Sequence, residues 1–424
     1  MRAFAVLVCC LACTEPPGPE PSPVVPVAPR EEAPPPTSPR PTVLYVGGDV
    51  LDGEALRDYA RTFDDPADGL AAVLSPLASR WSEPDAFVLV NLEVPIADAR
   101  RFALDATEAA PGRVRRVHLQ GAPWICEGLA RAGVDAVGLA NNHALDQARE
   151  GLAETVRCAR RAGLAVTGVG PHPNVHWPLV LGDEGQTLAV HSLYTGLDRG
   201  SVDPGEHARA FLDDDALAQV RQSATDHDTV VAVVHVVAEL EEEVDDAWRA
   251  WATRLVDAGA DAIVVHGTHL PMRVERFGAR RVPVAWGLGN LISDMGRLSG
   301  PRRQAERKEE NAATREGLVA RLRRVEAHAL SLEVLPVFVL DDRFLRWHGA
   351  LPPMHGADGA HADEIHFWLH PLGGCDEPAA LPSDWREPWR SELVRWMRAR
   401  RDDAVGRTGL SPARCEDEGW LSLL

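Results

Sequence analysis

Residues that can bind metal ions recur where predicted strands end. The set comprises Asp49, Glu93, Asn142, His143, His235, His266 and His269. In layered α/β folds, the loops at the ends of several strands converge on one edge of a sheet. One histidine at such a place is more often a structural residue, but ligand side chains at five strand ends predict a shared metal site.

The mixture of carboxylate, amide and imidazole groups limits the chemistry of such a site. These ligands together favour Mn, Zn or Fe, whereas Ca and Mg prefer oxygen ligands alone. One ion, or two about 3.5–4 Å apart, would lower the pKa of a bound water and polarise a phosphoryl or carbonyl oxygen. A histidine that does not bind metal could then protonate the leaving group. His143, beside the ligand-type Asn142, fits that role.

The elements that must position these residues alternate between strands and helices. Apolar or β-branched runs predict strands at 43–46, 86–90, 136–140, 164–169, 229–234, 262–265, 282–286, 318–325 and 330–340. Helices are predicted at 124–132, 147–162 and 245–258. The charged segment 297–316 has no apolar face, so it is expected to be a flexible insertion. The alternation predicts an α/β fold.

Three further polar residues each allow two interpretations. Asp146 stands just before a predicted helix, where an N-cap is more common than a metal ligand. Asn290 follows a glycine at a strand end and could orient a substrate or form a turn. Glu239 opens an acidic run, which is usually a solvated face.

Several short motifs resemble those of the CapA family, the bacterial poly-γ-glutamate capsule synthesis proteins. In family order they are Gly48-Asp49-Val50, Asn91-Leu92-Glu93, the segment ANNHALD from Ala140 to Asp146, His266-Gly267-Thr268-His269 and Gly287-Leu288-Gly289-Asn290. The ANNHALD segment is the most specific of them. The resemblance implies a calcineurin-like metallophosphoesterase fold, in which helices flank a β-sandwich.

The same resemblance implies a role for each matching position. The metal ligands would be Asp49, Glu93, Asn142, His235, His266 and His269. His143 would be the acid beside the metal-binding asparagine, and the cofactor would be one or two divalent ions. Glu239 and Asn290 are expected to contact the substrate.

The chain departs from the family pattern at positions that affect this chemistry. Leu51 stands where phosphoesterases of this class have a histidine ligand, so a single-metal site is as well supported as a two-metal site. Val236 and Val237 replace a Trp-Gly pair, and this change could alter the substrate pocket without removing a ligand.

Both ends of the chain lie outside the resembling region, which is expected to form a domain at 43–346. Residues 1–13 combine Arg2, a short apolar run and Cys13, which predicts an export signal with Cys13 lipidated; an ordinary cleaved signal is the alternative. Residues 14–42 are proline-rich and predict an extended linker. Residues 347–424 are expected to pack on the domain through tryptophans rather than to bind glycan.

The remaining cysteines and histidines carry weaker signals. Cys126 and Cys158 lie in predicted helices and are expected to be core thiols. Export would permit a disulfide between Cys375 and Cys415. A second metal site at His366 and His370 has little support, because no ligand set there has a recognised spacing.

The charge balance and the resemblance together set the functional prediction. Acidic residues outnumber basic ones by 63 to 44, giving a net charge of −19, which disfavours general binding of nucleic acid. Residues 1–13 predict an exported, membrane-anchored protein, and the resemblance implies a hydrolase that uses metal-activated water. It would act with the capsule-synthesis machinery on an anionic envelope polymer, at phosphoester or γ-glutamyl amide bonds. Leu51 favours the alternative, a non-catalytic export factor that binds the polymer or a partner.

Overall fold

The computed structural model describes most of the chain from residue 43 onward. The described ranges are 43–97, 119–170, 178–182, 187–196, 212–296, 312–326, 328–341, 367–372, 389–411, 415–416 and 420–423. The expected signal with Cys13, the proline-rich linker, Cys375 and His366 lie outside these ranges. No helix among the described residues has the length and apolar character needed to cross a membrane.

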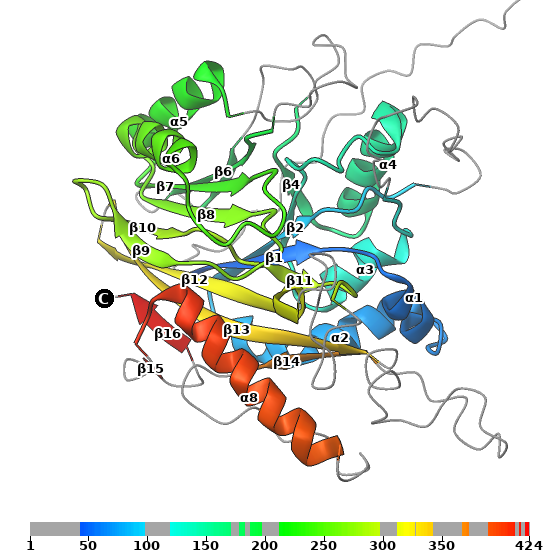
Figure 1. The fold of residues 1–424 in the computed structure, drawn as a ribbon. Coiled ribbons are helices and arrows are strands. Elements are labelled where there is room, and N and C mark those ends of the chain that lie inside the picture. Colours follow the sequence, from blue (N-terminus) through cyan, green and yellow to red (C-terminus); the bar gives the residue numbers. More distant parts are fainter. Residues whose placement is uncertain are drawn as a thin grey trace, which may run out of the picture. The chain divides into compact units, whose positions relative to one another are not determined.

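The larger sheet has β1 near its centre (Figure 1). Its main order is β15-β16-β13-β12-β1-β2-β3-β4, with β11 paired to β1 and β14 paired to β13. β2, β3 and β11 continue the parallel part, whereas β12 and β13 form an antiparallel hairpin. The strands are β1 (Val43–Val50), β2 (Ala86–Leu92), β3 (Ala136–Gly138), β4 (Ala165–Thr167), β11 (Asn290–Ile292), β12 (Glu316–Glu326), β13 (Ala329–Asp341), β14 (Phe367–Pro371), β15 (Cys415–Glu416) and β16 (Trp420–Leu423).

The smaller sheet has the order β5-β6-β7-β8-β10-β9. Its central strands β6, β7, β8 and β10 are parallel, and β5 and β9 are antiparallel edge strands. The strands are β5 (Leu179–Leu181), β6 (Leu188–Tyr194), β7 (Thr229–His235), β8 (Ala262–His266), β9 (Val274–Phe277) and β10 (Val282–Ala285).

Alternating side chains place these sheets face to face between helices. Leu44 and Val46 of β1 share one core with Val231 and Val233 of β7, whereas Tyr45 points into the core on the other face of β1. Burying every other residue on each face is the expected consequence of the two-residue period of a strand. The predicted fold class, a β-sandwich flanked by helices, is confirmed.

Helices cover the outer faces of both sheets. The larger sheet packs against α1 (Glu54–Ala60), α2 (Pro66–Trp81), α3 (Trp124–Arg131) and α4 (Ala148–Arg161), and the smaller against α5 (Asp214–Asp226) and α6 (Asp246–Ala258). The helix α8 (Trp389–Thr408) packs Leu393 and Met397 on Phe338 and Leu340 of β13. α8 therefore lies on the β13 face that carries Leu332 and Val334, which pack against the smaller sheet.

One sequence prediction about this fold is wrong. Residues 297–316 were expected to be a flexible insertion, but residues 312–316 form the short 3-10 helix η3 (Ala312–Arg315) and the start of β12. Residues 297–311 lie outside the described residues. Arg315 is completely buried, where its Nη1 donates to Asp341 Oδ2 at 2.8 Å. Residues 312–316 form regular structure because Arg315 has a buried partner in β13, which the local sequence cannot indicate.

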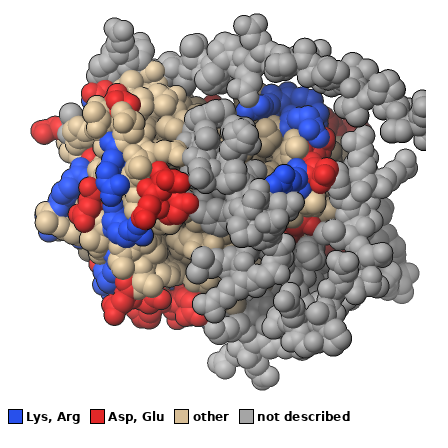
Figure 2. Space-filling view, turned by 90° about the horizontal axis from the view of Figure 1, so that it is seen from above, with Lys and Arg blue, Asp and Glu red and all other residues tan. Residues whose placement is uncertain are grey.

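The described surface carries acidic and basic side chains in small neighbouring groups (Figure 2). Exposed ion pairs of this kind each contribute about 0–1 kcal/mol to stability. At long range, the approach of charged molecules therefore depends on the net charge of −19 more than on these ion pairs.

Replacing Gly48 by alanine should destabilise the fold by about 1–3 kcal/mol or more. β1 and β11 approach so closely here that a Cβ on Gly48 would lie 2.3 Å from the carbonyl oxygen of Gly289. Urea unfolding measures the effect. Gly406→Ala in α8 is the matched control, since a Cβ there meets nothing within 4 Å and removal of a helical glycine should stabilise by about 0.5–1 kcal/mol. Equal stability of Gly48→Ala and the parent protein would contradict the close approach.

Candidate metal centre

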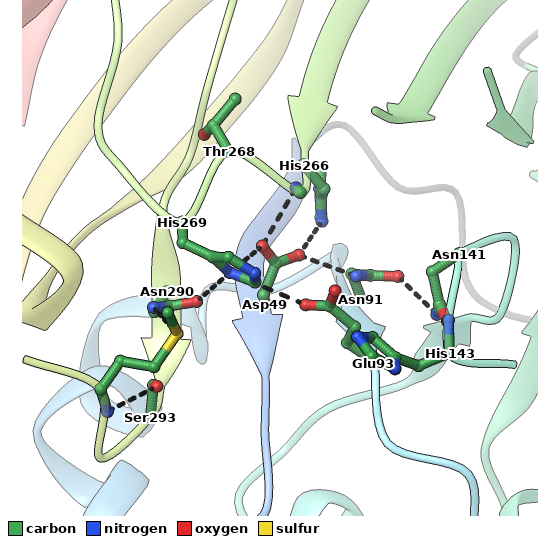
Figure 3. A network of polar contacts seen from close by, with 12 residues as sticks. Asp49, Asn91, Glu93, Asn141, His143, His266, Thr268, His269, Asn290 and Ser293 are labelled. Atoms are coloured by element: carbon green, nitrogen blue, oxygen red, sulfur yellow. Dashed lines mark hydrogen bonds and ion pairs between the residues drawn. The ribbon is translucent and has the colours of Figure 1, made fainter. Parts of the chain in front are cut away.

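Asp49, at the end of β1, is the centre of a buried polar cluster (Figure 3). Its Oδ1 accepts from Asn91 Nδ2 at 2.7 Å, and its Oδ2 accepts from the backbone N–H of Gly267 at 3.0 Å. Two imidazoles face the same carboxylate: His266 Nδ1 lies 3.5 Å from Oδ1 and His269 Nδ1 lies 3.4 Å from Oδ2. The first strand of the larger sheet and the loop after β8 of the smaller sheet therefore meet at this side chain.

Glu93, just after β2, faces the same group from the other side. Its Oε1 lies 3.5 Å from His235 Nε2, and its Oε2 lies 3.9 Å from His269 Nδ1. The backbone N–H of Glu93 donates to Val50 O, which fixes the start of this loop against the end of β1. Glu93 thus stands between the histidines of two different strand ends.

The cluster contains polar atoms that its own hydrogen bonds do not satisfy. Glu93 Oε2 and both ring nitrogens of His266 are buried and accept or donate no hydrogen bond. Leaving such a group unpaired costs about 1–3 kcal/mol, so native proteins rarely do so without a reason. Ligand atoms of Asp49, Glu93 and His269 lie within 4.8 Å of one another, and no other group of three such ligands occurs among the residues described. The donor set and the unpaired atoms fit a bound metal cation.

Two asparagines that the sequence analysis did not assign hold the cluster together. Asn141 Nδ2 donates to Leu92 O at 2.9 Å and to Asn91 Oδ1 at 3.2 Å. Asn91 Nδ2 then faces Asp49 and also lies 3.2 Å from His235 Nδ1. The available signal for Asn91 was a polar residue in the otherwise apolar strand AFVLVNL.

The general-acid candidate His143 is held by Asp146. His143 Nδ1 lies 2.6 Å from Asp146 Oδ2, which also accepts from the backbone N–H of Leu119 at 2.8 Å. Asp146 was expected to cap a helix, and that prediction is wrong: the N-cap of α4 is Gln147, without a side-chain cap. The Asp146 carboxylate binds His143 instead of capping the helix.

Other predicted site residues lie around this centre. Asn142 Oδ1 is 2.8 Å from His235 Nε2. Asn290 is completely buried, with its Oδ1 2.9 Å from His269 Nδ1 and its Nδ2 donating to Thr314 O, so it positions His269. Glu239 is exposed and acts on the cluster through its charge. Contacts therefore join six of the seven residues predicted from strand ends, namely Asp49, Glu93, Asn142, His235, His266 and His269. His143 is near enough for its charge to act on His235, and Cys13 lies outside the described residues.

His269 adopts an uncommon backbone conformation in this arrangement. Its φ is +57°, in the left-handed region that costs a non-glycine residue about 1–2 kcal/mol. Strain of this kind concentrates at functional sites, where the surroundings must hold it in place. Here the hydrogen bond to Asn290 and the contacts to two carboxylates supply that restraint.

Burial and mutual charge give the cluster unusual protonation behaviour. Burial alone would raise the pKa of Asp49, but contact with His266 and His269 holds it well below its ordinary value. Burial and the charge of Asp49 raise the pKa of Glu93. Burial lowers the pKa of His235 to about 3, although the negative charge of Asp49 opposes this shift. Burial would also lower the pKa of His269, but Glu93 and Asp49 raise it to about 10.

Metal-free protein should lose stability as the pH rises from about 6.5 to about 10. The folded-state pKa of His269, about 10, exceeds the ordinary value of 6.5. Its protonated ring therefore stabilises the fold fully below pH 6.5, and this contribution is lost as the pH rises through the folded value. Urea unfolding of chelator-treated protein measures the trend, with His269→Gln as the control. A parent protein whose pH dependence matches that of the variant would contradict the assignment.

A comparison with known protein families shows which family this chain belongs to. The family described as bacterial capsule synthesis protein PGA_cap matches residues 43–295. The chain belongs to this family. The matched region contains every residue of the metal centre and ends before β12. The predicted resemblance to CapA proteins is confirmed.

Two curated proteins are similar to this chain over part of their length. A Mycobacterium tuberculosis protein described as a probable polyglutamine synthesis accessory protein is 26% identical over 249 residues, covering 53% of this chain and 63% of that protein. The capsule biosynthesis protein CapA of Bacillus anthracis is 26% identical over 192 residues, covering 43% of this chain and 46% of CapA. The chain therefore spans less than two thirds of either relative.

Solved structures show a more distant likeness. A hypothetical protein from Thermus thermophilus has a TM-score of 0.39 at 15% identity, over 69% of this chain and 98% of that one. A novel phosphatase from Mycoplasma pneumoniae has a TM-score of 0.36 at 12% identity, over 70% of this chain and 86% of that one. Likeness of this degree does not bear on the function of this PGA_cap protein.

Proposed function

We propose that this protein is a metal-dependent hydrolase that acts in the synthesis or processing of an anionic capsule or envelope polymer. The observation that carries the proposal is the pairing of His143 with Asp146 beside a buried cluster in which Glu93 Oε2 and both ring nitrogens of His266 make no hydrogen bond. Membership of the capsule synthesis family supports the polymer as the biological context.

The ligands that would hold the cation are Asp49, Glu93 and His269, with His266 and His235 close to the same carboxylates. A divalent Mn, Zn or Fe ion there would supply Lewis acidity toward a phosphoryl or carbonyl oxygen and a more acidic water. The rest of the arrangement serves to keep the ligands in place: Asn91 orients Asp49, and Asn290 orients His269.

His143 is placed to donate a proton to a leaving group. Asp146 accepts the hydrogen bond from Nδ1, so Nε2 is the nitrogen left for exchange with a substrate. The same Asp146 oxygen also accepts from the backbone N–H of Leu119, so the carboxylate that orients the His143 ring is itself held in place. An acid held in this way suits either phosphoester or γ-glutamyl amide cleavage, because both need a protonated leaving group.

The location and partners follow from the sequence rather than from the metal centre. We infer that the protein is exported and anchored by a lipid on Cys13, where it would meet the polymer and the capsule-synthesis machinery. Replacing Cys13 by serine should move the protein from the membrane fraction to the soluble fraction. An unchanged distribution would contradict the anchor without affecting the hydrolase proposal.

Replacing His143 by alanine should lower kcat by about 10²–10⁴-fold and leave bound metal unchanged. The assay offers phosphodiesters and poly-γ-glutamate to metal-loaded protein, and elemental analysis measures the metal. Asp146→Asn should show a smaller loss, because it weakens the hydrogen bond that orients the His143 ring without removing the acid.

Two outcomes would count against the hydrolase. Turnover of the alanine variant equal to that of the parent would remove His143 from the mechanism. A metal-loaded parent that cleaves neither type of bond but binds poly-γ-glutamate would favour the non-catalytic alternative, which Leu51 also favours.

A further inference from the structure

Two buried thiols lie together between α3 and α4, outside the metal centre. Cys126 is in the first turn of α3 and Cys158 is in the last turns of α4, and both belong to the core on the outer face of the larger sheet. Both are free cysteines in this structure, with exposed fractions of 0% and 5%. The expectation that they are core thiols is correct.

The contacts around the thiols bring them within reach of each other. Cys158 Sγ lies 3.3 Å from Pro123 O, and the backbone N–H of Cys126 donates to the same oxygen at 3.2 Å. Both residues therefore bond to the same carbonyl oxygen, and the two thiols are close enough to shift each other's pKa. A disulfide needs its two Cβ atoms about 3.5–4.5 Å apart, and two thiols held at one carbonyl oxygen can approach this geometry by small side-chain movements.

We propose that Cys126 and Cys158 form a disulfide that joins α3 to α4 when the protein folds under oxidising conditions. In the reaction, one cysteine thiolate attacks a small-molecule disulfide such as glutathione disulfide and releases one thiol. The second cysteine then displaces the other thiol, so one disulfide is reduced to two thiols as the protein loses two hydrogens. The pair is nearly inaccessible in the folded protein, so oxidation precedes the docking of the two helices.

The proposed bond would enclose the acid loop of the metal centre. The chain between Cys126 and Cys158 contains β3 and the loop that carries His143 and Asp146. Gln147, which follows this loop, donates to Leu119 O. Closing this segment into a ring restricts the unfolded chain, which is the main way a disulfide stabilises. The ring would also limit movement of α4 relative to α3, on either side of the loop that carries His143.

Peptide mapping of the full chain tests the bond directly. Protein refolded with glutathione disulfide is denatured, alkylated without reduction, digested and examined by mass spectrometry. We expect a cross-linked peptide pair containing Cys126 and Cys158, about 2 Da lighter than the two peptides together. A Cys375→Ser, Cys415→Ser variant keeps this pair and removes the two other cysteines that follow residue 13, so that only Cys9, Cys10 and Cys13 remain besides the pair. Full alkylation of both Cys126 and Cys158 in the parent would overturn the proposal.

Thermal unfolding with and without a reducing agent gives a second, independent test of the disulfide. Reduction should lower the melting temperature of the oxidised parent by about 5–10 °C. The Cys126→Ala, Cys158→Ala variant has a lower melting temperature from lost packing, but reduction should not change it. A parent that is as insensitive to reduction as this variant would also overturn the proposal, and neither arm depends on hydrolase activity.

Discussion

Replacing Asp49 by asparagine should abolish metal binding at the described cluster. Asp49 contributes the carboxylate that faces both His266 and His269, and an amide of the same shape cannot supply its negative charge. Loss of a residue that only supports a ligand typically costs about 10–100-fold in metal affinity, so loss of the ligand itself should cost more. Elemental analysis after dialysis, and titration with Mn or Zn, measure the stoichiometry and the affinity.

Asp135→Asn is the matched control for this variant. Asp135 also stands beside a strand of the larger sheet, where its Oδ2 accepts from Val88 N at 2.8 Å, but it is no part of the cluster. The control should keep the metal content of the parent. If Asp49→Asn also binds metal with the affinity of the parent, Asp49 is not a ligand.

Replacing Asp341 by alanine should destabilise the protein by about 3–5 kcal/mol. Asp341 and Arg315 are both completely buried, and Arg315 also donates to the carbonyl oxygens of Gly296 and Val339. Removing the carboxylate leaves a buried cation without its opposite charge, which costs far more than the loss of a surface pair. Urea unfolding of metal-free protein measures the change in free energy.

A surface pair and a double replacement serve as controls. Glu154→Ala removes the partner of the exposed Arg157 and Arg161, and each exposed pair should contribute about 1 kcal/mol or less. The variant Arg315→Met, Asp341→Leu removes both charges and should recover most of the lost stability. A cost for Asp341→Ala no greater than that for Glu154→Ala would contradict the importance of the buried pair.

The buried pair also connects the hairpin of β12 and β13 to the metal centre. Thr314, next to Arg315, accepts the hydrogen bond from Asn290 Nδ2, and Asn290 faces His269. A shift of η3 would therefore move the residue that restrains His269. Metal affinity of Asp341→Ala should fall with its stability, although none of its changed atoms touches the cluster.

The strands that carry the cluster could be predicted because each is locally distinct. The segment TVVAVVH of β7 is a continuous β-branched run that ends in a ligand, and GGDV of β1 has a carboxylate just after two glycines. Such runs fix where the strands end. They do not show that β1 and β2 belong to one sheet while β7 and β8 belong to the other, because that depends on pairing between distant residues.

The supporting contacts were not predictable from local patterns. Asp146 before α4 has the sequence context of an N-cap, and only the position of His143 in space shows its other use. Asn91 and Asn141 interact across 50 residues, and Arg315 reaches Asp341 across an entire hairpin. A propensity argument describes each residue with its neighbours in sequence, so it cannot assign partners of this kind.

Anomalous diffraction from crystals grown with Mn, Fe or Zn tests the central claim most directly. The structure predicts a peak within bonding distance of Asp49, Glu93 and His269, which is absent from crystals of Asp49→Asn. Data collected on both sides of each absorption edge would also identify the ion. A parent crystal with no peak among these three side chains, or with its metal held only by other residues, would contradict the metal centre and the hydrolysis proposed from it.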